Sequence, residues 1–364
     1  MKLIRPDFEK SILNVSATFA NFLGKKTSIT TIPFLDKKLR LGYKNVVYFC
    51  LDGMGVFPLT QNLDESSFLR KNVYEVVTSV FPSTTTNATT SLLGATYPLS
   101  HGMFGWSMYI PALEKVVDVF TQRDSLSGEE VPLESYQDTF DISFYFDDCK
   151  SEYQTCGVFP PYVNHQKNNF VYNTLDEMFI LLTSLCKKEG KQFVYCYHGE
   201  PDSTMHRYGV TSRHSRKIFS LLNDKIQEFA ENNPDTLIVI TSDHGQTDIS
   251  DYIELFKDEE LLATLDKPMY MEARAVAFRI KANFENAFLK AMEKYQDIKV
   301  FKTEDLIKEN FFGKGDKGYL LGDYIGVVTN DHSQLLLSPT MVKFRGHHTS
   351  LSEKEMHVPL IVIN

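Results

Sequence analysis

The sequence predicts an α/β fold in which helices flank a doubly wound, mostly parallel central sheet. Continuous apolar runs at 45–51, 193–198 and 236–241 are typical of strands that are covered on both faces. Stretches with helical periodicity, at 172–188 and 212–232, separate these runs along the chain. Because parallel neighbours need a crossover connection, an alternation of buried strands and helices favours a parallel sheet over hairpins.

The other elements are predicted from the same patterns and from their boundary residues. Pro82 cannot donate a hydrogen bond to a sheet ladder, so the strand before it ends there. Pro234 ends the helix over 212–232, because proline disfavours helical conformation in the residue before it. The remaining predicted helices cover 1–22, part or all of 55–72, 87–93, 284–295 and 303–310; the remaining strands cover 74–80, 274–280, 299–301 and 358–363; and 23–43 is predicted to be a loop with a short β segment.

The chain contains no internal repeat, low-complexity tract or linker, so we expect a single domain over residues 1–364. From 103 to 169 the pattern is aromatic and irregular, with Gly and Pro interruptions, which predicts an elaboration over the active face of the sheet. Residues 250–340 carry successive β, α and β patterns. We expect them to form a small α+β insertion, a cap within the same domain.

Composition narrows the class of partner. The formal net charge is -9, which argues against sequence-independent binding to nucleic acid or to anionic membranes, because both reward basic surfaces. The N-terminus has no signal-peptide pattern, and no apolar run approaches the ~18 residues of a spanning helix. The five cysteines form no C-x-x-C pair. We therefore expect a cytoplasmic protein without disulfides, and the oligomeric state stays open, a homodimer among the options.

Polar side chains follow the buried strands at the points where the strands end. Asp52 follows the run at 45–51, Asp202 follows the run at 193–198, and the pair Asp243-His244 follows the run at 236–241. Thr84 comes shortly after the strand that ends before Pro82, and His347-His348 stand in a loop marked by Gly346. In an open α/β sheet, ligand sites lie beyond the carboxyl ends of the strands, so these side chains are predicted to converge.

Two of these groups have the spacing of metal ligands. Asp202 and His206 are separated by one helical turn, which places both on the same side of a helix. Asp243 and His244 are adjacent, and Gly245 permits the turn that would let both reach one ion. Each of these motifs, taken alone, is more simply interpreted as a turn or as a solvent-exposed Asp–His pair on a helix. Together, carboxylates and imidazoles without thiolates favour Zn²⁺, with Mn²⁺ as an alternative.

The stretch 80–102 is crowded with hydroxyl side chains at a strand-to-helix junction. Such a junction carries free backbone N–H groups and the positive end of the helix dipole, which suit an anion held against a nucleophilic oxygen. Taken alone, the stretch is better explained as an N-cap in a Thr-rich loop, because Ser and Thr are ordinary capping residues. The other polar groups favour the first interpretation.

Taken together, these motifs resemble the alkaline phosphatase superfamily and, within it, the type I phosphodiesterase/nucleotide pyrophosphatase branch. The resemblance extends over nearly the whole chain and follows the order of the family's motifs. The matching pieces are Leu51-Asp52-Gly53, Phe81-Pro82-Ser83-Thr84-Thr85-Thr86-Asn87, Gly94, Tyr97-Pro98, His101-Gly102, Glu200-Pro201-Asp202-Ser203, His206-Arg207-Tyr208-Gly209, Ser242-Asp243-His244-Gly245 and Gly346-His347-His348.

The resemblance implies two metal sites and a threonine nucleophile. One metal would be held by Asp202, His206 and His348, and the other by Asp52, Asp243 and His244. Thr84 is the implied nucleophile, because the family places it three residues before the asparagine, here Asn87. Asn87 and Thr85 would bind the substrate's non-bridging oxygens. The sequence departs from the family at Ala88, where a histidine is usual, and at Thr349, where a glycine is usual, so His348 is preferred to His347 on spacing alone.

These expectations describe a two-metal phosphoric ester hydrolase that acts through a phosphothreonine on a small-molecule phosphate ester or nucleotide. A phosphomonoesterase or a phosphonate hydrolase on the same scaffold is an alternative. No arginine lies between Thr84 and Gly102 to bind a second phosphate charge, which favours diesters. An alternative of another class is a non-catalytic protein that binds metal or nucleotide.

Overall fold

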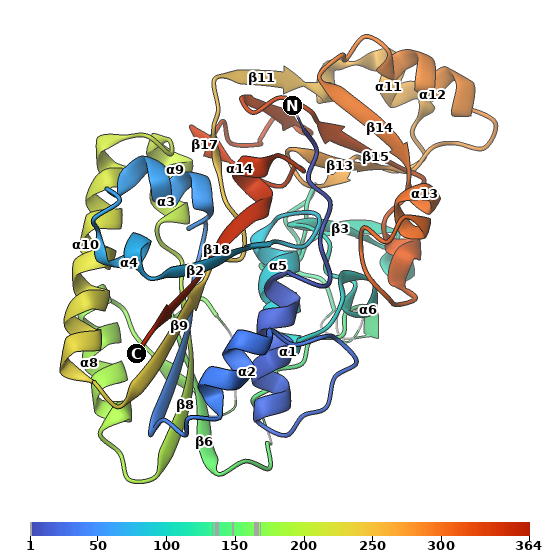
Figure 1. Ribbon diagram of the computed structural model, residues 1–364. Helices are drawn as coiled ribbons and strands as arrows, with labels where there is room; N and C mark the ends of the chain where they lie inside the picture. The colour runs from blue at the N-terminus through green and yellow to red at the C-terminus, as the bar shows by residue number, and fades with distance from the viewer. Residues whose placement is uncertain (1, 133, 135–137, 148, 164–166, 168) are drawn as a thin grey trace.

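The computed structural model of the chain describes residues 2–132, 134, 138–147, 149–163, 167 and 169–364 (Figure 1). Over the described residues, the centre is a seven-stranded sheet. Its strands, in spatial order, are β2 (Val73–Thr78), β18 (His357–Ile363), β9 (Thr236–Thr241), β1 (Asn45–Leu51), β8 (Lys191–His198), β6 (Tyr153–Phe159) and β7 (Asn169–Val171).

The pairing of the sheet is parallel except at one strand. β1 pairs in parallel with both β8 and β9, and β6 pairs in parallel with β8 and β7. β18 pairs antiparallel with β9 and with β2, because the chain enters it from the end of the sheet where β9 stops. The predicted doubly wound, mostly parallel fold is therefore confirmed, and β18 is the exception to its parallel pairing.

Helices cover both faces of the central sheet, and β1 divides its side chains between them. Val46, Tyr48 and Cys50 pack into the core beneath one set of helices, whereas Val47 and Phe49 pack on the opposite side. This alternation explains why the strand reads as a continuous apolar run. The first face is covered by α1 (Ile12–Phe22), α2 (Pro33–Leu39) and α5 (Thr85–Gly94), and the second by α3 (Val56–Asn62), α4 (Phe68–Lys71), α8 (Leu175–Cys186) and α10 (Arg213–Asn232) (Figure 1).

Three local predictions at the N-terminal end differ from the structure. The first helix begins at Ile12 rather than at residue 1, since Ser11 and Asn14 form a capping box there. The segment 23–43 contains the short helix α2, which Pro33 starts at its first position. Finally, β2 is only half-buried because it lies at the edge of the sheet and leaves Tyr74 exposed.

A second, antiparallel sheet combines two segments that are distant in the sequence. Its seven strands over the described residues are, in order, β14 (Ile298–Lys302), β15 (Tyr324–Val328), β13 (Ala275–Phe278), β12 (Tyr270–Met271), β3 (Ser107–Ile110), β4 (Lys115–Asp118) and β5 (Arg123–Asp124). The pairing of β12 with β3 joins the segment 103–169 to the segment 250–340. Sequence patterns placed these segments separately and did not predict β15.

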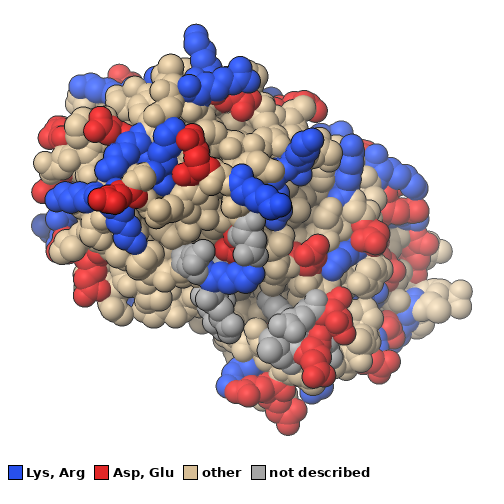
Figure 2. Space-filling view, turned by 90° about the horizontal axis from the view of Figure 1, so that it is seen from below, with Lys and Arg blue, Asp and Glu red and all other residues tan. Residues whose placement is uncertain are grey.

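Short elements connect the two sheets and complete the fold. They are α6 (Pro98–His101), α9 (Asp202–Tyr208), β10 (Thr247–Asp248), β11 (Asp251–Glu254), α11 (Glu259–Thr264), α12 (Glu285–Met292), α13 (Thr303–Lys308), β16 (Ser333–Leu336), β17 (Gly346–His347) and α14 (Glu353–Met356). None of the described helices combines the length and the apolar character needed to cross a bilayer. Seen from below, acidic and basic side chains are interspersed over the surface (Figure 2).

Candidate metal centre

Three neighbouring strands deliver the acidic residues to one end of the central sheet. Asp52 directly follows β1, Asp243 follows β9, and Asp202 opens α9 shortly after β8. The turn at Gly53 has a φ of +72°, and a side chain there would approach the Cβ of Asp202 to 2.9 Å. Glycine at this position therefore allows the ends of β1 and β8 to bring their carboxylates together.

The first cluster contains Asp202, His206 and His348, whose ligand atoms all lie within 4.8 Å of one another. The Nε2 atom of His206 is 3.3 Å from Oδ2 of Asp202 and 3.2 Å from Nε2 of His348. His206 stands one turn after Asp202 on α9, and His348 follows β17 from near the other end of the chain. His347 is not part of this group of ligand atoms, and its Nδ1 accepts a hydrogen bond from the His348 backbone N–H over 2.9 Å.

The second cluster contains Asp52, Asp243 and His244, with all three side chains buried. The Nε2 atom of His244 is 3.4 Å from Oδ1 of Asp52 and 3.3 Å from Oδ2 of Asp243. The two clusters are adjacent, because the rings of His244 and His348 stack with centroids 3.6 Å apart. The structure thus brings together all six side chains that the sequence nominated as ligands.

Electrostatics indicates that the second cluster is built for cations. Burial raises the pKa of Asp52 well above its ordinary value, and the nearby carboxylates of Asp243 and Asp202 raise it further. Oδ1 of Asp52 and Oδ2 of Asp243 are buried without a hydrogen-bond partner among the described residues. Unpartnered carboxylate oxygens facing an imidazole nitrogen are costly unless a cation fills the space between them. The donor set therefore fits a divalent metal ion.

The three imidazoles of the clusters are oriented by backbone carbonyl groups. His206 Nδ1 lies 2.8 Å from the Gly346 oxygen, His348 Nδ1 lies 2.8 Å from the Ser83 oxygen, and His244 Nδ1 lies 3.0 Å from the Gly245 oxygen. A proton on each Nδ1 satisfies these carbonyls and leaves a lone pair on Nε2 for a metal. Glu200 accepts a hydrogen bond from the Thr204 backbone N–H over 3.0 Å and so braces the start of α9, which carries Asp202 and His206.

The hydroxyl that faces the metal clusters belongs to Thr85. Its Oγ1 atom is 3.1 Å from Nε2 of His244, and the residue is partly exposed at the first position of α5. The Thr84 hydroxyl points elsewhere: it donates to Oε1 of Glu272 over 2.5 Å, and the residue is only 3% exposed. The local backbone explains the difference, because Thr84 is the extended N-cap of α5, whereas Thr85 has entered the helix.

The start of α5 also offers hydrogen-bond donors to an anion. The Ala88 N–H donates to the Thr84 carbonyl, so the backbone N–H groups before it, in the first turn, have no partner within the helix. The Asn87 side chain is fully buried, and its Nδ2 donates to the Pro82 carbonyl over 2.9 Å. This bond braces the turn that carries the threonines. The predicted contact of Asn87 with substrate stays a prediction.

Three residues that sequence reasoning missed support the centre. The Tyr197 hydroxyl donates to Oδ2 of Asp52, Gln246 donates to Oδ1 of Asp202 over 2.7 Å, and Glu272 accepts from Thr84. Tyr197 lies three residues before Glu200, and Gln246 directly follows Gly245, so proximity to a polar motif was the one signal available for them. Glu272 follows β12, where the sequence carries no motif.

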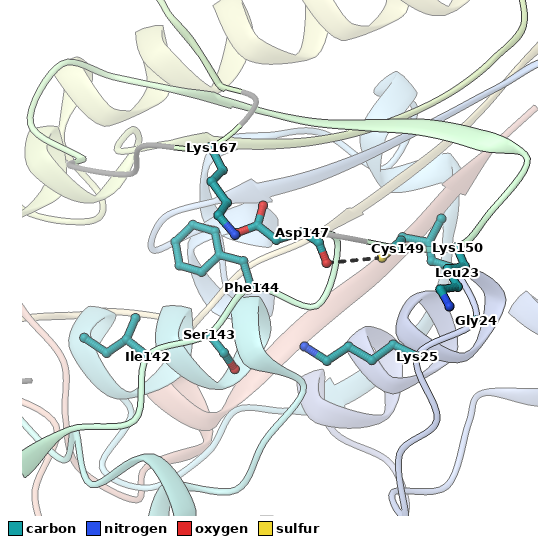
Figure 3. Close-up of a pocket in the computed structure, with 10 residues that line it drawn as sticks. All are labelled: Leu23, Gly24, Lys25, Ile142, Ser143, Phe144, Asp147, Cys149, Lys150 and Lys167. Atoms are coloured by element: carbon teal, nitrogen blue, oxygen red, sulfur yellow. Dashed lines mark hydrogen bonds between the residues drawn. The ribbon is translucent and has the colours of Figure 1, made fainter. Parts of the chain in front are cut away.

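A cavity of about 460 Å³ opens beside the first cluster. Its lining includes Asp202 and His206 together with Arg207, Lys343 and Phe344. A second cavity, of about 670 Å³, lies between the end of α1 and residues 142–147 and 149–150 (Figure 3). None of the residues that line the second cavity belongs to either cluster, whereas the first cavity is lined by two residues of the first cluster.

The fold thus places two carboxylate–imidazole clusters beside a threonine at the start of a helix. The profile of the type I phosphodiesterase/nucleotide pyrophosphatase family matches residues 46–350. The chain belongs to this family.

Individual relatives are more distant. The rat ectonucleotide pyrophosphatase/phosphodiesterase family member 3 is 24% identical over 342 residues, which cover 86% of this chain and 37% of that protein. This chain therefore spans little more than a third of the length of the curated relative it matches. An inactive variant of murine ectonucleotide pyrophosphatase/phosphodiesterase 5 in complex with AMP shares the fold, with a TM-score of 0.67, 17% identity and 87% coverage of each chain. Phosphonoacetate hydrolase from Sinorhizobium meliloti in complex with phosphonoformate has a TM-score of 0.61, with 15% identity, and the match covers 87% of this chain and 89% of that one.

Proposed function

We propose that this protein is a two-metal phosphoric ester hydrolase of the phosphodiesterase/nucleotide pyrophosphatase type. One observation carries the proposal: the Thr85 hydroxyl lies 3.1 Å from an imidazole nitrogen that also faces two buried carboxylates. A nucleophile beside a metal ligand is the arrangement that lets a metal lower the pKa of a hydroxyl group. The sequence had nominated Thr84, and the geometry supports Thr85 instead.

The two clusters would each hold one divalent ion. Asp202, His206 and His348 would bind one, and the second cluster would bind the other. Zn²⁺ is the first choice and Mn²⁺ the alternative, because the donors are carboxylates and imidazoles without thiolates. When bound, such ions polarise the phosphoryl oxygens and stabilise the negative charge on the attacking and leaving oxygens.

The chain's own residues would carry out the displacement in two steps. The Thr85 oxygen attacks the phosphorus atom as its proton leaves to solvent, and the bond to the leaving alkoxide breaks, which yields a phosphothreonine. A water molecule then attacks the phosphothreonine in line, releases the Thr85 oxygen and returns a proton to it. The free N–H groups at the start of α5 are placed to hold the non-bridging oxygens during both steps.

The substrate would be a small-molecule phosphate ester or nucleotide that enters through the 460 Å³ cavity. Lys343 lines this cavity and lies 3.7 Å from Glu254. We expect Lys343→Met to raise KM for a nucleoside triphosphate about fivefold, which corresponds to the loss of an exposed ion pair. The KM for a diester whose leaving group carries no charge should stay unchanged. Lys257→Met is the matched control, because Lys257 pairs with the same Glu254 but does not line the cavity. Equal effects of both substitutions on KM would argue against nucleotide binding in this cavity.

The function is tested by ester turnover in purified, metal-reconstituted protein. We expect hydrolysis of bis-p-nitrophenyl phosphate that is abolished by a chelator and restored by Zn²⁺ or Mn²⁺. Higher kcat/KM for p-nitrophenyl phosphate would instead favour the monoesterase alternative, and turnover confined to phosphonoacetate would favour the phosphonate hydrolase alternative. Metal uptake without turnover of any ester would favour the alternative of a non-catalytic protein that binds metal or nucleotide.

The ligand assignment is tested by metal stoichiometry. We expect about two divalent ions per chain in the unaltered protein and about one in His206→Ala, because this substitution removes a donor from the first cluster alone. Elemental analysis after dialysis measures the ratio. His347→Ala is the control and should keep about two ions, since His347 lies outside both clusters. The assignment is wrong if the two variants lose metal equally.

We propose, further, that residues 1–364 form a single catalytic domain of the alkaline phosphatase type. One hydrophobic core supports this organisation, because it combines Phe81 and Leu99 of the nucleophile region with Ile325 of the second sheet. Partial proteolysis followed by unfolding of the fragments would reveal independent units if they existed.

A cytoplasmic location remains a proposal based on the sequence. It is supported by the thiols of Cys50, Cys156, Cys186 and Cys196, which are buried and form no disulfide. Cell fractionation with a tagged chain would test it, and recovery from the medium would overturn it.

A further inference from the structure

Glu272 is a buried carboxylate beside the turn that carries the threonines, and no sequence motif identified it. It follows β12 in the second sheet and is 6% exposed. Its Oε1 atom accepts two hydrogen bonds, from the Thr84 hydroxyl over 2.5 Å and from the Trp106 backbone N–H over 2.7 Å. Thr84 is the immediate neighbour of Thr85, so Glu272 contacts the turn that carries the nucleophile.

The charge of Glu272 has no basic counterpart. No Lys or Arg of the described ranges forms an ion pair with it, although acidic side chains are almost never fully buried without a partner. Burial raises its pKa to about 7, and the charged group that most opposes this rise is His206 of the first cluster. The position of the carboxylate follows from its contact with Thr84, since a phosphoryl group on the adjacent Thr85 would lie one residue away from that contact.

The two hydrogen bonds that Glu272 accepts do not by themselves require an acidic side chain. A glutamine would accept the same two hydrogen bonds without the desolvation cost of a carboxylate. The acidic charge therefore has an effect of its own on what binds beside Thr85.

We propose that Glu272 determines charge selectivity by disfavouring phosphoryl groups with two negative charges, and so favours phosphodiesters over phosphomonoesters. This inference rests on the proposed function. A phosphate monoester is mostly a dianion above pH 6, whereas a diester is a monoanion. A nearby carboxylate in a site of reduced dielectric repels the dianion more strongly than the monoanion. At an effective dielectric constant of about 20, one extra unit of negative charge lowers the affinity by about tenfold or more.

The test compares two esters in Glu272→Gln at pH 8 with the metals reconstituted. We expect the ratio of kcat/KM for p-nitrophenyl phosphate to that for bis-p-nitrophenyl phosphate to rise about tenfold or more. The diester value should also rise, because its single negative charge is no longer repelled, but the monoester value should rise further, since it carries two negative charges. Glu285→Gln is the matched control: Glu285 is also a glutamate of the second-sheet region, but it is exposed and pairs with Lys302. It should leave the ratio unchanged.

Binding of inorganic phosphate provides a readout that does not require turnover. At pH 8 phosphate is mostly a dianion, so its Kd measured by calorimetry should fall by more than about tenfold in Glu272→Gln and stay constant in Glu285→Gln. An unchanged ester ratio and an unchanged phosphate Kd would overturn the proposal and leave Glu272 as a positioning residue for Thr84. If the unaltered protein hydrolysed neither ester, the proposed function would fail, and the phosphate measurement would still decide the role of Glu272.

Discussion

Replacing Thr85 with alanine should lower kcat/KM for bis-p-nitrophenyl phosphate by about a thousandfold or more, because the variant lacks the attacking oxygen. The metal content should stay near that of the unaltered protein, since Thr85 belongs to neither cluster. Thr85→Ser should retain turnover, because it keeps a hydroxyl at the same position. Steady-state kinetics combined with elemental analysis measures both quantities.

Thr84→Ala is the decisive comparison, because sequence spacing favoured Thr84 as the nucleophile. The Thr84 hydroxyl is committed to Glu272, so we expect its loss to lower kcat/KM by about tenfold or less through disorder of the turn. Mass spectrometry of rapidly acid-quenched protein should locate the phosphoryl group on Thr85. A thousandfold loss in Thr84→Ala together with near-normal turnover in Thr85→Ala would restore the sequence-based assignment.

Two pairs of the proposed ligands could be predicted from local spacing, whereas Asp52 and His348 join the clusters only through the fold. Asp243 and His244 are adjacent at the end of a buried strand, and Asp202 and His206 are one helical turn apart. For each pair, the spacing in the sequence is enough to predict that its two side chains lie close together. The continuous apolar run of β1 likewise predicts a central strand, because a strand in the middle of the sheet is covered on both faces.

The direction of a hydroxyl within three consecutive threonines could not be predicted in this way. Thr84 has extended backbone dihedrals, with φ of -130° and ψ of 150°, and Thr85 begins the helix. This change of conformation turns the two hydroxyls in different directions, and it depends on which residue caps α5. Any of the three threonines is an acceptable N-cap, so sequence preference does not choose among them.

Contacts between segments that are distant in the sequence could not be predicted either. Glu272 reaches Thr84 only because β12 pairs with β3, and β12 is two residues long. A two-residue strand leaves no periodicity to detect, and antiparallel pairing between remote segments is set by packing rather than by local propensity. The supporting carboxylate of the centre therefore became visible only in the folded chain.

The largest effect on stability is expected at a buried ion pair behind the metal centre. Arg274 Nε donates to Oε1 of Glu355 over 2.9 Å, Nη2 donates to Oε2 over 3.1 Å, and both side chains are fully buried. Arg274 also donates to the carbonyl of Asn330 over 2.7 Å, and Glu355 accepts from the Ser350 N–H over 2.9 Å. The pair thus fixes the segment that follows His348.

Arg274→Met should lower the free energy of unfolding by about 3–5 kcal/mol, because it leaves the Glu355 carboxylate buried without its partner. Urea unfolding of the metal-free protein measures the change. Arg5→Met is the matched control, since Arg5 and Glu309 form an ion pair whose side chains are 63% and 49% exposed; its effect should stay below about 1 kcal/mol.

Adding Glu355→Leu to Arg274→Met should recover part of the lost stability, because the double variant contains no unpaired buried charge. The double variant should nevertheless bind metal less tightly at the first cluster, because Glu355 no longer accepts from the Ser350 N–H and His348 is less firmly placed. Equal unfolding free energies for Arg274→Met and Arg5→Met would show that solvent reaches the Glu355 carboxylate. The ion pair would then have no part in placing His348.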